Sequence, residues 1–81
     1  MTGRPRLTTP VRIVLADLAR RDEPAYGLQI ATDTGLGTGT LYPLLRRLSE
    51  AGWLSVTEET GPHPSRPARR FYALTEKAPR L

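Results

Sequence analysis

The feature that most constrains the fold is a run of leucines at helical spacing in the middle of the chain. Four leucines recur at positions i, i+3, i+4 and i+7, and they are Leu41, Leu44, Leu45 and Leu48. This spacing places them on one face of an α-helix. We predict a helix over residues 39–51, with Thr38 as its N-cap and Gly52 at its end. Because this helix starts with Thr-Gly-Thr, its first turn carries only short side chains.

Two shorter helices are predicted before the leucine-rich one. Apolar residues at helical spacing follow Thr9-Pro10, which suits an N-cap and a first helical residue, and they predict a helix over residues 10–21. A second helix is predicted over residues 25–34, with Gly35 just past its end. Only Gly-Leu-Gly separates this helix from the next, so the two helices must pack at a steep angle.

The period of the sequence changes after Gly52. Residues 53–57 and 70–74 are rich in aromatic and β-branched side chains, which predicts two strands, with Trp53 and Phe71 as core residues. The segment between the strands holds several prolines, so it predicts a hairpin with a long tip. Three helices followed by a β-hairpin is the order of a winged helix-turn-helix. The predicted class is therefore α+β, mostly α, with three helices and a two-stranded wing.

The 81 residues suit a single domain, which we expect over residues 10–77 between a basic arm, 1–9, and a short tail, 78–81. Eleven of the 12 basic residues are arginine, and the net charge is +4. Positive charge gathers in residues 1–21 and 60–81, whereas residues 22–59 carry a net negative charge. Guanidinium groups form forked contacts to phosphate and guanine, so this placement favours a nucleic-acid partner.

Several other classes of function are not expected. The chain has no cysteine and a single histidine, His63, between two prolines, which gives neither a metal site nor a catalytic group with an orienting partner. Gly-Leu-Gly-Thr-Gly at 35–39 lacks the strand before it and the lysine after it that a nucleotide-binding loop needs. We therefore expect no enzyme activity, no metal and no cofactor. With no spanning segment and no signal-peptide pattern, we expect a cytoplasmic protein.

Candidate DNA contacts lie opposite the leucines on the helical wheel, with Tyr42 and Arg47 on the flanks. In a winged helix-turn-helix the recognition helix, here residues 38–51, enters the major groove with its N-terminal end first. The candidate residues of this helix are Thr38, Gly39, Thr40, Tyr42, Pro43, Arg46 and Arg47. The wing, residues 59–70, offers Arg66, Arg69 and Arg70 to phosphates beside the groove. In the arm, Arg4 and Arg6 are candidates for phosphate or minor-groove contact.

At this point the sequence resembles a known family. The segments GTLYPLLRRL at 39–48, EAGWL at 50–54 and RRFYALTEK at 69–77 are similar to the PadR-like transcriptional regulators, and the resemblance covers roughly residues 10–78. It implies a winged helix that binds double-stranded DNA and usually represses a nearby promoter. It also implies that Tyr26 and Gly27, at the start of the second helix, approach backbone phosphates.

The sequence departs from the family pattern at its C-terminal end. Family members usually continue into long helices that form the dimer, whereas this sequence has Ala78-Pro79 there and ends at Leu81. We expect a short form that lacks this helix, and either a homodimer through the first helix and the arm or a complex with a partner chain. The alternative function is a winged helix that serves as a protein-interaction module without DNA specificity of its own.

Overall fold

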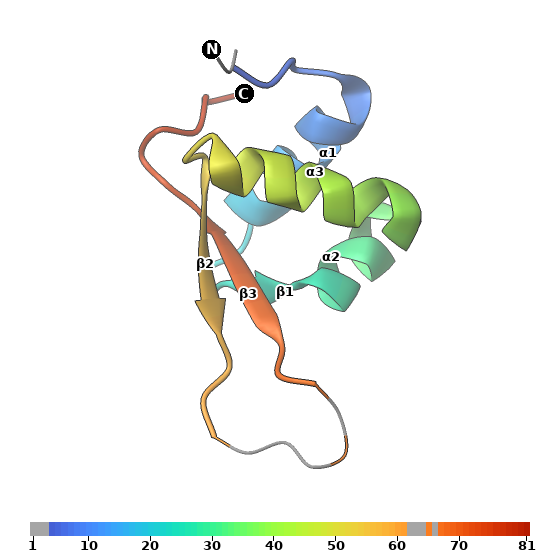
Figure 1. The fold of residues 1–81 in the computed structure, drawn as a ribbon. Coiled ribbons are helices and arrows are strands. Elements are labelled where there is room, and N and C mark those ends of the chain that lie inside the picture. Colours follow the sequence, from blue (N-terminus) through green and yellow to red (C-terminus); the bar gives the residue numbers. More distant parts are fainter. Residues whose placement is uncertain (1–3, 62–64, 66) are drawn as a thin grey trace.

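The computed structural model describes residues 4–61, 65 and 67–81. Along the chain it contains α1 (Thr9–Ala19), β1 (Ala25–Tyr26), α2 (Gly27–Thr34), α3 (Thr38–Glu50), β2 (Leu54–Glu58) and β3 (Arg70–Leu74). The three helices pack together above a small antiparallel sheet, and the β2–β3 hairpin extends away from them (Figure 1). The predicted fold class, an α+β winged helix-turn-helix, is confirmed. None of the described helices has the length and apolar character needed to cross a bilayer.

The first helix begins one residue earlier than predicted. Thr8, and not Thr9, is the N-cap, and its Oγ1 accepts a hydrogen bond from the N–H of Val11 at 3.4 Å. Pro10 then occupies the second helical position, where a missing N–H costs nothing because the first turn has no intrahelical acceptor for it. The helix also ends earlier, at Ala19, with Arg20 as its C-cap.

The second helix is shorter than predicted because its first two residues form a strand. Ala25 and Tyr26 were expected in the helix, but they pair in antiparallel fashion with Tyr72 and Phe71 of β3. The sheet therefore has three strands in the order β1-β3-β2. The helix α2 starts at Gly27, and the Gln29 side chain accepts the N–H of Tyr26 at 3.0 Å. At its end, Gly35 takes a φ of 75°, as expected of a C-terminal glycine.

The third helix has the predicted length but starts at Thr38. Its N-cap is Gly37, which has no side chain to cap the helix, so the N-terminal N–H groups lack a side-chain acceptor. At the other end, Gly52 has a φ of 82°. Its N–H donates to the carbonyl oxygen of Ser49 at 3.0 Å, and the N–H of Trp53 donates to the carbonyl oxygen of Leu48 at 3.0 Å. These two bonds form a Schellman motif, which reverses the chain from α3 into β2.

The core lies between the three helices and the inner side of the sheet. Its largest fully buried side chains are Val14, Ile30, Leu41, Leu45 and Leu48. Trp53 is 4% exposed and joins the hairpin to this core, as predicted. The prediction for Phe71 was wrong, because Phe71 is only half-buried and stands outside the core cluster. It faces Tyr26 across the β1–β3 pair at a ring-centroid distance of 5.9 Å.

One charged side chain is buried at the junction of α1 and α2. Asp17 is 4% exposed, and its carboxylate accepts hydrogen bonds from Arg20 at 2.7 Å and Arg21 at 3.1 Å. Arg21 also pairs with Asp33 near the end of α2. A buried carboxylate requires such partners, because desolvation of an unpaired charge is costly. The network therefore connects the C-terminal ends of α1 and α2.

Replacement of Asp17 by Asn is expected to lower the free energy of unfolding by about 1–2 kcal/mol, because the acceptor loses its charge and the amide nitrogen cannot accept one of the two arginine hydrogen bonds. Urea denaturation followed by circular dichroism measures the change. Asp22→Asn, at an exposed residue, is the matched control and should change stability by less than about 0.5 kcal/mol. Equal stabilities of the two variants would contradict a stabilising role for the network.

Candidate nucleic-acid interface

The helix α3 has one buried side and one side open to solvent. The four leucines of the predicted apolar face are all buried, at 8% exposure or less. On the open side lie Gly39, Tyr42, Pro43, Arg46 and Arg47, all exposed. Tyr42, at 43% exposure, is a large aromatic ring that folding leaves partly in water. The side of α3 that the wheel assigned to a ligand is therefore accessible along its length.

The N-terminal end of α3 is unobstructed. Gly37, Thr38, Gly39 and Thr40 are exposed, and a Cβ added at Gly37 or Gly39 would meet no atom within 4 Å. Helix N-termini carry partial positive charge and free N–H groups, which favour an anion such as phosphate. Pro43 lies further along the same side of the helix, and its ring cannot donate a backbone hydrogen bond. The bare first turn expected from the sequence is thus present on the surface.

The ring of Tyr42 packs directly on the backbone of α2. A Cβ built on Gly27 would lie 2.5 Å from Cε1 of Tyr42 and 3.0 Å from its hydroxyl oxygen. Glycine is therefore required at this position for the ring to lie where it does. Gly27 itself is buried beneath Tyr42, so it supports the tyrosine rather than forming part of the exposed surface.

Tyr26 connects the wing to the helices. The guanidinium carbon of Arg69 lies 4.3 Å from the centre of the Tyr26 ring, a distance typical of a cation–π contact. The Tyr26 ring also packs against the Phe71 ring in an edge-to-face arrangement, with an interplanar angle of 78°. The Arg69 side chain is thus held over an aromatic ring at the base of the wing.

A cleft of about 900 Å³ separates α3 from the wing. Its walls include Tyr42 and Arg46 from α3, Tyr26 next to α2, and Arg69 and Arg70 next to or on β3. Two of these arginines have carboxylate partners: Arg46 lies 3.7 Å from Glu50, and Arg70 lies 3.5 Å from Glu58. All four side chains are well exposed, so these pairs are weak and can exchange for a phosphate.

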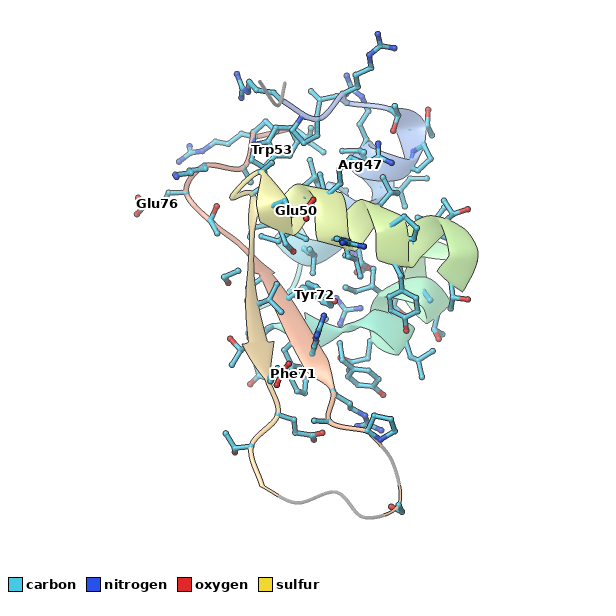
Figure 2. All side chains as sticks on the ribbon, viewed as in Figure 1. Arg47, Glu50, Trp53, Phe71, Tyr72 and Glu76 are labelled. Atoms are coloured by element: carbon cyan, nitrogen blue, oxygen red, sulfur yellow. The ribbon has the colours of Figure 1, made fainter. Side chains whose placement is uncertain are left out.

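Tyr72 and Val56 line the same cleft and were missed by the sequence analysis. They are cross-strand partners on β2 and β3. In the sequence, only the alternation of apolar and polar residues along the two strands could have indicated that they share a face. Burial raises the pKa of the Tyr72 phenol, against the opposing effect of the Arg70 charge. Its hydroxyl therefore stays protonated at neutral pH. Figure 2 shows Tyr72 and Phe71 along β3, beneath the part of α3 that carries Glu50.

Apart from the buried Gly27, the predicted site residues that the structure describes fall into two groups. Tyr26, Tyr42, Arg46, Arg69 and Arg70 meet around the cleft, with Thr38, Gly39, Thr40 and Pro43 further along the open side of α3. A second group borders the other flank of α3, and its members are Arg4, Arg6 and Arg47. Arg66, a predicted wing contact, lies outside the described residues, as does His63.

Comparisons with known proteins agree with this fold. The family model described as "Transcriptional regulator PadR-like family" matches residues 14–78. The chain is similar to the solved structure of a PadR-like transcription factor from Bacteroides fragilis, with a TM-score of 0.66 and 32% identity, covering 84% of this chain and 69% of that one. It is also similar to a PadR family transcriptional regulator from Eggerthella lenta, with a TM-score of 0.64 and 32% identity, covering 85% of this chain and 62% of that one.

A third solved structure, smu.1704 from Streptococcus mutans UA159, has a TM-score of 0.63 and 26% identity, covering 91% of this chain and 71% of that chain. All three of these chains extend beyond the region that they share with this one. The search of curated proteins found no significant match.

Proposed function

Since the chain belongs to the PadR-like family of transcriptional regulators, we propose that it binds double-stranded DNA in a sequence-specific manner and acts as a repressor in the cytoplasm. In this proposal the open side of α3 lies in the major groove. Tyr42 and Arg46 contact bases or phosphates there, and the arginines of the wing hold the backbone beside the groove. The repressor role is the one that the resemblance to the family implies, since a protein bound over a promoter blocks access by the polymerase.

The observation that carries the proposal is the convergence of α3 and the wing on one cleft. Tyr42 and Arg46 line it from the helix, and Arg69 and Arg70 line it from the wing. Phosphate contacts fix the register of a protein on the duplex, whereas side chains in the groove select the sequence. This cleft offers arginines for the phosphates and α3 side chains for the groove, and both sets are carried on rigid elements. The Tyr42 ring on Gly27 and the Arg69 side chain on Tyr26 supply the rigidity.

The variants Tyr42→Ala and Arg46→Ala are each expected to lower DNA affinity by about 10-fold, the usual effect of one lost contact. Both side chains are exposed, so the melting temperature should change little. Fluorescence anisotropy with the DNA upstream of the chain's own gene measures the affinity. Arg80→Ala is the matched control, because it removes the same charge from an exposed residue outside α3, the wing and the arm.

The outcome of this test separates the two candidate functions. If Tyr42→Ala and Arg46→Ala bind DNA as well as Arg80→Ala does, α3 is not the recognition helix. If the unmodified chain binds no DNA even at low salt, the protein-interaction function replaces the proposal, and the exposed Leu28 and Val56 beside the cleft are the first residues to test for a protein partner.

A further inference from the structure

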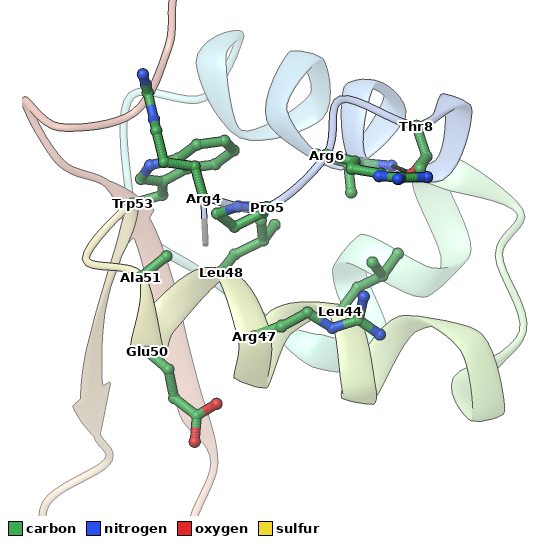
Figure 3. Close-up of a pocket in the computed structure, with 11 residues that line it drawn as sticks. Arg4, Pro5, Arg6, Thr8, Leu44, Arg47, Leu48, Glu50, Ala51 and Trp53 are labelled. Carbon is green, nitrogen blue, oxygen red and sulfur yellow. Dashed lines mark hydrogen bonds between the residues drawn. The ribbon is translucent and has the colours of Figure 1, made fainter. Parts of the chain in front are cut away.

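We propose that a second cleft, between the N-terminal arm and α3, binds backbone phosphates of the DNA strand that the wing does not contact. This inference rests on the proposed function and adds a site to it. The cleft has a volume of about 570 Å³ and lies along the flank of α3 that carries Arg47 (Figure 3). Its other wall is the arm, represented by residues 4–8.

The arm is held against the body of the protein at both ends. The guanidinium carbon of Arg4 lies 5.9 Å from the centre of the Trp53 ring, and Trp53 is itself anchored in the core. At the other end Thr8 caps α1, and Nε of Arg12 donates to the carbonyl oxygen of Leu7 at 3.1 Å. The arm therefore forms a wall of fixed position, which differs from a free tail that reaches into a minor groove.

The cleft combines an apolar floor with unpaired positive charge. Leu44, Leu48 and Trp53 contribute to the floor. Arg6 projects from the arm and Arg47 from α3, with Leu44 between them (Figure 3). No carboxylate of the described residues forms an ion pair with either guanidinium, in contrast to Arg46 and Arg70 in the other cleft. Glu50, which also borders the arm cleft, pairs with Arg46.

The two clefts lie on opposite flanks of the open side of α3. Tyr42, Arg46 and Ser49 border the wing cleft, whereas Leu44, Arg47 and Ala51 border the arm cleft. Figure 1 shows the same arrangement, with α3 crossing between the arm on one side and the wing on the other. A helix with its side chains is about 10–12 Å wide, close to the roughly 12 Å width of the major groove.

Because the helix fills the width of the groove, each flank of α3 lies next to a different phosphate backbone. A helix seated in the major groove has one phosphate backbone along each of its flanks. If the wing holds the backbone on one flank, the backbone on the other flank lies beside the arm. Arg6 and Arg47 are two cations there that pair with no carboxylate of the described residues, while the third, Arg4, lies over the Trp53 ring. Forked guanidinium groups suit phosphate oxygens. The geometry thus assigns two guanidinium contacts to the phosphate backbone on each flank of α3.

The test compares the salt dependence of DNA binding between two double variants of the full chain. Arg6→Ala/Arg47→Ala removes two of the three arginines that line the arm cleft, and Arg69→Ala/Arg70→Ala removes the two wing arginines that line the other cleft. Each lost phosphate contact lowers the magnitude of the log–log salt slope by about 1, so each double variant should lose about 2. The control is Lys77→Ala/Arg80→Ala, which removes two exposed charges outside both clefts.

Trp53 provides a second readout because it is the only tryptophan in the chain and lines the arm cleft. DNA should change the Trp53 emission of the unmodified chain and of the wing variant, but not that of the arm-cleft variant at equal saturation. Salt slopes in which the arm-cleft variant matches the control while the wing variant loses about 2 would overturn the arm site and leave the proposed function intact. If no form binds DNA, the proposed function and the arm site both fail.

Discussion

Gly27→Ala is expected to weaken DNA binding by up to about 10-fold, as much as the loss of the Tyr42 side chain itself. The new Cβ would lie 2.5 Å from Cε1 of Tyr42, so the ring must leave the backbone of α2. Tyr42 is 43% exposed and has room to rotate into solvent, so the fold should survive. Anisotropy titrations measure the affinity, and thermal melting measures stability.

A double-mutant cycle shows whether the effect runs through the tyrosine. Gly27→Ala combined with Tyr42→Ala should bind no more weakly than Tyr42→Ala alone, because the displaced ring is already absent. Additive losses of affinity would mean that Gly27 acts on DNA binding by another route. Binding by Gly27→Ala at the level of the unmodified chain would mean that the position of the Tyr42 ring does not matter.

Leu45→Ala is expected to lower the free energy of unfolding by about 2–5 kcal/mol, because it removes buried methyl groups and leaves a cavity. Leu45 lies on the buried side of α3, with 0% of its surface exposed. Small domains have about 5–15 kcal/mol of stability in total, so this one change removes a large share. Urea denaturation measures it.

The matched control for Leu45→Ala is Leu28→Ala. This change removes the same atoms from a side chain that is 57% exposed. It should cost less than about 0.5 kcal/mol, as most surface substitutions do. A similar loss of stability in both variants would contradict the assignment of the leucine-rich face of α3 to the core.

Much of the helical part of the fold was predictable because its signals are local. The leucine spacing defines α3, and Gly35 and Gly52 mark helix ends at which a positive φ is needed. The errors arose where distant residues decide the structure. Ala25 and Tyr26 have no local strand signal, and they become β1 only because β3 offers an edge to pair with. The helical spacing of the residues before Ile30 gave no indication that Ala25 and Tyr26 would pair as a strand.

The site was predictable at the level of residue types and helix faces. The wheel placed Tyr42 and Arg46 on the open side of α3, and the structure has them there. Sequence patterns could not show that Tyr42 rests on Gly27 or that Arg69 rests on Tyr26, because both contacts depend on how separate elements pack. They also could not show that the arm folds back onto Trp53.

The most direct test of DNA recognition by this chain is a salt titration of binding to two duplexes of equal length. One duplex carries the region upstream of the chain's own gene, and the other has an unrelated sequence. We expect tighter binding to the upstream region, with a log–log slope of about −3 to −5, as three to six phosphate contacts would give. Equal affinity for the two duplexes, or no binding at low salt, would contradict sequence-specific recognition of that DNA.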